Sequence, residues 1–168
     1  MYTKDQLFDP DFWKTFSTDD YKFSVPEHWE SMEPWAPIIQ FQIQNAEEDD
    51  FALILQTTAD KLSPLVHNKE QIVESLFDIW PKLIKDFKPV KHEWITDEHL
   101  PYFFAEYDSV LDEFDVTTRY YLWIVGRKTI TFSMLFNRDA PEEVENFELL
   151  ADLLLRLFKL KINLKPEE

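Results

Sequence analysis

Two histidines and their acidic neighbours are the residues of this chain best suited to bind a metal ion. His92 and His99 lie at the ends of the stretch HEWITDEH, which also holds Glu93, Asp97 and Glu98. Imidazole and carboxylate groups bind zinc, but structural zinc sites use closely spaced ligand pairs, and six residues separate these two histidines. The acidic runs also lack the glycine and the spacing of a calcium-binding EF-hand loop. We therefore expect both histidines on the surface, and we expect no metal ion and no cofactor.

Nucleophilic catalysis is the second chemistry that the residue types allow, because the chain has seven serines. None of them stands in the G-x-S-x-G motif of serine hydrolases, and the chain contains no cysteine. Gly126 is the only glycine, which excludes the phosphate-binding P-loop and the dinucleotide-binding G-x-G-x-x-G motif. We therefore predict no catalytic residues and expect that the protein is not an enzyme. A small-molecule enzyme of unknown class stays an alternative, because carboxylates could pair in a pocket beside His92 or His99.

The elements that would position such residues follow from the spacing of apolar residues and from the ten prolines. Asp9-Pro10 predicts the start of a short helix that runs to Phe16. The apolar spacing over residues 69–87 predicts a long helix that Pro81 kinks or divides, and Asp139 precedes a closing helix. Strands are expected at 21–25, 38–44, 51–57, 90–96, 102–111, 116–125 and 128–136, with a loop at 27–37.

This order of elements sets the fold class. Strands come in runs and the helices are kept apart from them, which indicates the α+β class rather than alternating β-α-β units. Gly126 lies between two strand patterns, where a tight hairpin turn requires positive φ. We predict a single α+β domain over residues 1–168, with a largely antiparallel twisted sheet of about six to seven strands and helices packed on it.

Two short motifs carry a resemblance to a known fold family. The first is YKFSVPEHW at residues 21–29, and the second is the hairpin that runs from Tyr120 through VGRKTITF to Phe132. With the closing helix from Glu142, they resemble the PsbP-like fold, which the photosystem PsbP proteins share with a Ran-binding nuclear-import factor. Some bacterial members of this fold, the Eag-type chaperones, escort effectors of type VI secretion. The resemblance brings no catalytic or metal-binding motif, and its members have several binding roles.

The charge of the chain is strongly negative and unevenly distributed. The 17 basic and 33 acidic residues give a net charge of −16, and all of the excess lies in the first 115 residues. Such a charge disfavours binding to nucleic acid or to an anionic membrane surface. Acidic residues gather at Glu47–Asp50 and in a second group consisting of Glu106, Asp108, Asp112, Glu113 and Asp115. The excess can simply keep the protein soluble, or it can steer a basic partner to this surface.

Aromatic residues supply a second signal for partner binding. Trp29 and Trp35 lie among prolines and acidic residues in the predicted loop. Tryptophan is enriched at the energetic centres of protein interfaces, so these two side chains are candidate anchors. The alternative is that they belong to the core, like most of the aromatic residues in the chain.

These observations predict a non-enzymatic bacterial binding protein, foremost an immunity protein that neutralises a basic toxin or effector. The alternative within the same fold is an Eag-type chaperone that binds an apolar helix in a groove. The N-terminus lacks the pattern of a secretory signal and no apolar run could span a bilayer, so we expect a cytoplasmic protein, with a homodimer allowed. The partner-binding residues predicted are Glu47, Glu48, Asp49, Asp50, Asp112, Glu113, Asp115, Trp29 and Trp35.

Overall fold

The computed structural model describes residues 3–27, 31–32, 39–44, 51–96, 100–111, 113–138 and 144–161. The chain divides into two compact units, which are described separately. The terminal unit consists of Met1–Glu30 and Ala140–Glu168, and the central unit consists of Ser31–Asp139. No helix in the described ranges is long and apolar enough to cross a membrane.

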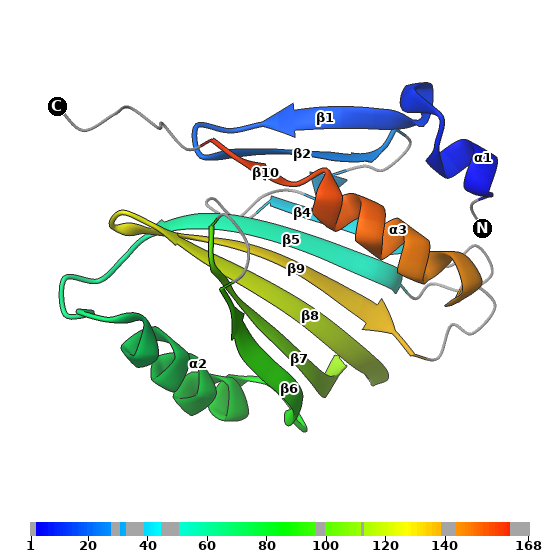
Figure 1. Cartoon of the computed structure of the whole chain (residues 1–168). Helices are drawn as coiled ribbons and strands as arrows, with labels where there is room; N and C mark the ends of the chain where they lie inside the picture. Colours follow the sequence, from blue (N-terminus) through cyan, green and yellow to red (C-terminus); the bar gives the residue numbers. More distant parts are fainter. Residues whose placement is uncertain are drawn as a thin grey trace, which may run out of the picture. The chain divides into compact units, whose positions relative to one another are not determined.

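The terminal unit contains a three-stranded sheet in the order β1-β2-β10 (Figure 1). Tyr21 and Phe23 of β2 are buried, and the Tyr21 ring lies 5.2 Å from the ring of Phe158, which follows the last helix. Leu150 and Leu154 of that helix are also buried. The elements are α1 (Lys4–Leu7), the 3-10 helix η1 (Pro10–Phe12), β1 (Trp13–Ser17), β2 (Tyr21–Pro26), α3 (Val144–Arg156) and β10 (Lys159–Leu160).

The predicted helix from Pro10 to Phe16 is wrong beyond its first turn. Asp9 does cap a helical turn, by accepting a hydrogen bond from the backbone N–H of Asp11, but the chain then extends into β1. The Phe16 ring stacks on Phe23 of the paired strand with centroids 5.6 Å apart. Pairing with β2 therefore overrides the local helix signal, since cross-strand aromatic pairs such as Phe16 with Phe23 stabilise a paired strand.

The central unit contains a seven-stranded antiparallel sheet in the order β3-β4-β5-β9-β8-β7-β6. This arrangement confirms the predicted α+β class with a largely antiparallel sheet. Gly126 forms the β8–β9 turn with φ of 60°, as the hairpin pattern predicts. The short strand β3 falls within the segment predicted as a loop. The strands are β3 (Ser31–Met32), β4 (Ile39–Gln44), β5 (Phe51–Lys61), β6 (Lys88–Ile95), β7 (Tyr102–Leu111), β8 (Phe114–Val125) and β9 (Lys128–Asn137).

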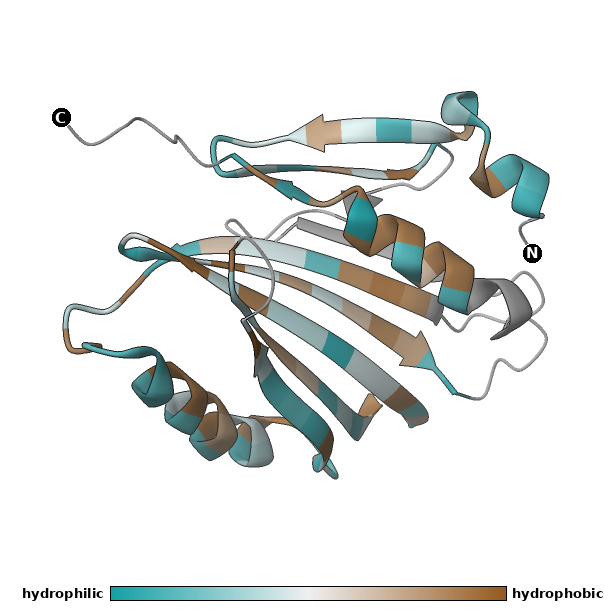
Figure 2. Ribbon diagram, viewed as in Figure 1, coloured by the Kyte–Doolittle hydropathy of each residue, from teal (hydrophilic) through white to brown (hydrophobic). Residues whose placement is uncertain are grey.

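The helix α2 (Lys69–Leu83) packs on this sheet over β6, β7 and β8 (Figure 1). Asn68 and Gln71 form a capping box at its start, and Figure 2 shows apolar and polar residues on separate sides of the helix. The helix is continuous through Pro81, so the expected division does not occur. Pro81 lies in the last turn, and the helix ends two residues later, so few hydrogen bonds depend on that position.

Candidate binding groove

The sheet face on which α2 packs is apolar beneath the helix and becomes polar on the neighbouring strands β9 and β5. Beneath α2 the side chains are apolar, with Phe103, Ala105 and Leu122 buried against the helix. The register places Thr131 opposite Leu122 and Thr58 opposite Thr131, so these side chains point to the same face. The hydroxyl groups of Thr58 and Thr131 are hydrogen-bonded to each other. The strands β5 and β9 therefore present a polar surface beside the helix.

A groove of about 420 Å³ lies between α2 and these two strands. Ile72, Leu76 and Trp80 of α2 form one wall of the groove. The floor is polar and comes mainly from β5 and β9, including Gln56, Thr58, Asp60, Thr129, Thr131 and Ser133. An apolar wall beside a polar floor suits an amphipathic ligand better than a wholly apolar one.

The apolar wall continues along α2 beyond the groove. Ile79 is 46% exposed and Leu83 is 79% exposed. They follow Ile72 and Leu76 at intervals of three and four residues, which places all four on one side of the helix. Large aliphatic side chains that stay exposed in a row are a common mark of an interaction surface.

Trp80, Tyr107 and Tyr120 meet in one part of the groove, which we call its base. The Trp80 ring lies 5.1 Å from the rings of both Tyr107 and Tyr120. Burial raises the pKa of the Tyr120 phenol far above its ordinary value, and the neighbouring Tyr107 raises it further. Burial also raises the pKa of the Tyr107 phenol, an effect that the neighbouring Thr118 partly offsets. Both phenols therefore stay protonated at neutral pH and can donate hydrogen bonds, but cannot act as bases.

The Thr118 hydroxyl lies close enough to the Tyr107 phenol to lower its pKa, but it makes no hydrogen bond of good geometry in the described part of the chain. Thr118 is 1% exposed and stands opposite Tyr107 in the β7–β8 pair. A buried hydroxyl in this state lowers the stability of the fold. It lies beneath the groove and is not one of the residues that line it.

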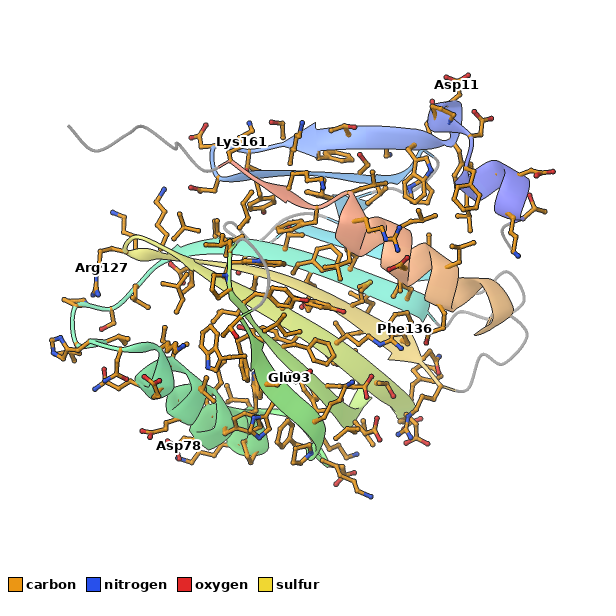
Figure 3. The ribbon with its side chains drawn as sticks, viewed as in Figure 1. Asp11, Asp78, Glu93, Arg127, Phe136 and Lys161 are labelled. Atoms are coloured by element: carbon orange, nitrogen blue, oxygen red, sulfur yellow. The ribbon has the colours of Figure 1, made fainter. Side chains whose placement is uncertain are left out.

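An arginine in the β8–β9 turn fixes the segment that leads into α2. The Arg127 guanidinium donates hydrogen bonds to the carbonyl oxygens of Ser63 at 2.6 Å and Val66 at 3.0 Å. The backbone N–H of Leu62 in turn donates to the Arg127 carbonyl at 2.8 Å. Figure 3 shows Arg127 at the end of the hairpin, beside this segment. Arg127 thereby helps to set where α2 begins and where its groove wall lies.

The predicted steering and anchoring residues lie away from this groove or outside the described residues. Glu47, Glu48, Asp49, Asp50, Asp112, Trp29 and Trp35 are outside the described residues. Glu113 is exposed in the β7–β8 turn with φ of 74°, and the exposed Asp115 lies 3.9 Å from Arg138. Neither lines the groove.

Arginines also lie close to Asp108 and Glu106, two further members of the second acidic group. Arg138 also lies 3.8 Å from Asp108, and Arg119 lies 3.3 Å from Glu106. These pairs offset part of the negative charge along β7 and β8. An anionic surface at this end of the sheet is therefore weaker than the sequence alone suggests.

The candidate metal residues are not gathered in the described part of the chain. His92 is exposed on β6 with its ring 4.5 Å from the Phe77 ring of α2, and His99 is outside the described residues. Within the described ranges, no group of three or more His, Asp or Glu side chains could hold a metal ion.

The groove itself was not predicted from the sequence. Two local signals point toward it. The β9 pattern alternates Thr129, Thr131 and Ser133 with buried apolar residues, and the apolar side of α2 is wider than packing on the sheet requires. Only the folded sheet, in which β5 pairs with β9, shows that the polar side chains of these strands lie beside the apolar side of α2.

Comparisons with known proteins identify the fold but not a sequence family. No protein-family model matches the chain, and no curated protein matches it. Cyanobacterial PsbP (CyanoP) from Synechocystis matches with a TM-score of 0.64 at 13% identity, covering 91% of this chain and 95% of that one.

Two further solved structures are similar over most of their length. A protein of unknown function from Pseudomonas aeruginosa, described as a candidate regulator, matches with a TM-score of 0.54 at 12% identity, over 93% of this chain and 98% of that one. LpqN of Mycobacterium tuberculosis, involved in cell envelope biogenesis, has a TM-score of 0.54 at 11% identity, over 91% and 86% of the two chains. The chain has the PsbP-like fold, which confirms the resemblance seen in its motifs.

Proposed function

We propose that this protein is a non-enzymatic binding protein that holds an apolar or amphipathic segment of another protein in the groove beside α2. The observation that supports this proposal is the aliphatic side of α2. Ile72 and Leu76 form a wall of the groove, and Ile79 and Leu83 extend the same row into solvent. A row of this kind binds the apolar side of a partner helix, because both surfaces are removed from water together.

The polar floor supports a segment with two unlike sides. A helix lying along α2 would set its apolar side against Leu76 and its neighbours and its polar side against the hydroxyl groups of Thr58 and Thr131. Hydroxyl groups can donate as well as accept, so the floor accommodates several polar side chains. This recognition matches the Eag-type chaperone role that the resemblance suggests, in which an effector segment is held before secretion.

The wall of the groove can be tested with exposed positions whose substitution leaves the core intact. The probe is a neutral synthetic helical peptide with leucines on one side and glutamines on the other. We expect Leu83→Asp and Ile79→Asp each to weaken its binding roughly tenfold, since burial of a Leu side chain contributes about 1.5–3 kcal/mol. Leu65→Asp is the matched control, because Leu65 is 81% exposed and does not line the groove. Fluorescence anisotropy measures the binding. Equal loss in all three variants, or no binding by the unaltered protein, would contradict the proposal.

The immunity-protein function is the second candidate, and the charge of the chain favours it. The net charge of −16 lies entirely in the first 115 residues, and Glu113 is an exposed member of the acidic set. A basic toxin would be captured quickly by such a protein, because long-range attraction accelerates association.

Ionic strength separates the two candidates. The purified product of the neighbouring gene is the partner to test by stopped-flow association. For an immunity protein we expect the association rate to fall steeply with salt, and to fall also when Glu47–Asp50 are reversed to lysine. For groove binding we expect little salt dependence and a loss of affinity in Leu83→Asp.

A further inference from the structure

The strand β6 is the outer edge of the seven-stranded sheet. It pairs with β7 on one side, and among the described strands none pairs with its other side. Lys88 to Glu93 are all exposed. Figure 3 shows Glu93 on this strand at the open margin of the sheet. An exposed edge presents backbone N–H and C=O groups that another strand can pair with.

Only the first part of this edge is protected against such pairing. Pro89 has no N–H to donate, and the register with β7 shifts between Pro89 and Lys91. From Lys91 to Ile95 the pairing with β7 is regular. This second part of β6 therefore has neither a proline nor a register shift to interrupt pairing with another strand.

The charges along this part are complementary to a second copy of the same strand. Two antiparallel copies of β6 must be related by a two-fold axis normal to the sheet, so the register is centred on one residue. Centring on Lys91 would place two lysines opposite each other, and centring on Glu93 would place two glutamates opposite each other. Centring on His92 places Lys91 opposite the partner's Glu93, twice.

The described contacts hold these charged side chains on one face of the sheet. Lys91 stands opposite Glu106 and Glu93 opposite Phe104 in the β6–β7 pair, and the Lys91 ammonium lies 5.3 Å from the centre of the Phe104 ring. His92 is on the opposite face, where its ring contacts Phe77. Lys91 and Glu93 are thus presented side by side, next to the edge, on a face that the helix α2 does not occupy.

We propose that two copies of this protein associate through β6, in an antiparallel register centred on His92, to form a continuous sheet of two central units. The pairing segment is short, so the dimer is weak and its population depends on protein concentration. The proposal is independent of the groove, which lies on the other side of α2 from this edge and stays available to a ligand.

Charge exchange at Lys91 and Glu93 tests both the dimer and its register by sedimentation velocity. Lys91→Glu and Glu93→Lys should each raise the dissociation constant by roughly tenfold or more, because each turns two attractive cross-strand pairs into two repulsive pairs. The double variant K91E/E93K should restore the dimer of the unaltered protein. An equimolar mixture of the two single variants should form heterodimers, since all cross-strand pairs are then attractive.

Three results would overturn the proposal. They are a protein that stays monomeric at every concentration, a dimer that neither single variant weakens, and a double variant no better than the singles. Circular dichroism checks that each variant is folded. Because the restoring variants carry the same substitutions as the weakening ones, a general loss of fold cannot imitate the expected pattern.

Discussion

The Arg127 guanidinium donates a hydrogen bond of 2.6 Å to the carbonyl oxygen of Ser63, a residue 64 positions earlier in the chain. A second hydrogen bond of 3.0 Å reaches the Val66 carbonyl. The turn of one hairpin is thereby joined to the segment that leads into α2. This connection couples the position of the groove wall to the β8–β9 hairpin.

We expect Arg127→Ala to lower the free energy of unfolding by about 1 kcal/mol, because two hydrogen bonds from a charged but exposed group are lost. Hydrogen exchange should become faster in residues 62–72, and urea unfolding should give the change in stability. Arg156→Ala is the control, since its exposed ion pair with Asp152 should contribute about 0.5 kcal/mol or less. Equal exchange rates in both variants would show that Arg127 does not hold the segment.

The buried Thr118 hydroxyl gives an unusual prediction for a core substitution. Thr118→Val removes a hydroxyl that has no well-formed hydrogen bond in the described part of the chain, while keeping the shape of the side chain. We expect the protein to gain about 1 kcal/mol of stability, measured by urea unfolding. Thr131→Val is the matched control and should destabilise, because it leaves the Thr58 hydroxyl without the partner it has now. A loss of stability in Thr118→Val would mean that its hydroxyl is in fact satisfied.

The hairpins of this protein could be predicted because their signals are local. Gly126 marks the β8–β9 turn, and the strands that flank it alternate in apolar character. The strand β1 could not be predicted in the same way. Asp9-Pro10 does begin a helical turn, but whether the next residues continue it depends on β2, which only the folded sheet brings alongside.

The binding groove could not be predicted because it depends on contacts between distant residues. Thr58 and Thr131 are 73 residues apart in the sequence and meet across two paired strands, and Leu76 of α2 joins them only through helix packing. The acidic group shows the same limit in another form. Counting charges locates Asp108 and Asp115, but not Arg138, which lies close to both.

The only glycine of the chain allows a test of backbone strain without a change in packing. Gly126 has φ of 60°, and a Cβ atom at this position would meet nothing within 4 Å. We expect Gly126→Ala to cost about 1 kcal/mol, through strain in the left-handed region alone. Gly126→Asn should cost less, because asparagine tolerates this region better. Thermal unfolding of both variants measures the difference, and equal stability of Gly126→Ala and the unaltered protein would contradict the assigned turn.

The buried phenols at the base of the groove predict how stability depends on pH. The folded-state pKa of Tyr120 lies well above the ordinary value of a tyrosine, because burial disfavours the phenolate. The folded protein therefore keeps this proton at pH values where the unfolded chain releases it. The stabilising contribution is full below the ordinary tyrosine pKa of about 10 and is lost as the pH rises above that value.

We expect the free energy of unfolding to fall above about pH 10, and Tyr120 to contribute up to about 1.4 kcal/mol per pH unit to that fall. Tyr120→Phe should flatten the alkaline slope while leaving the pH dependence between pH 6 and about 9 unchanged. Tyr107→Phe should flatten it less, because the neighbouring Thr118 partly offsets the effect of burial on the pKa of Tyr107. Urea unfolding at a series of alkaline pH values measures each slope. If Tyr120→Phe kept the slope of the unaltered protein, then Tyr120 would ionise alike in both states, and the base of the groove would be open to water.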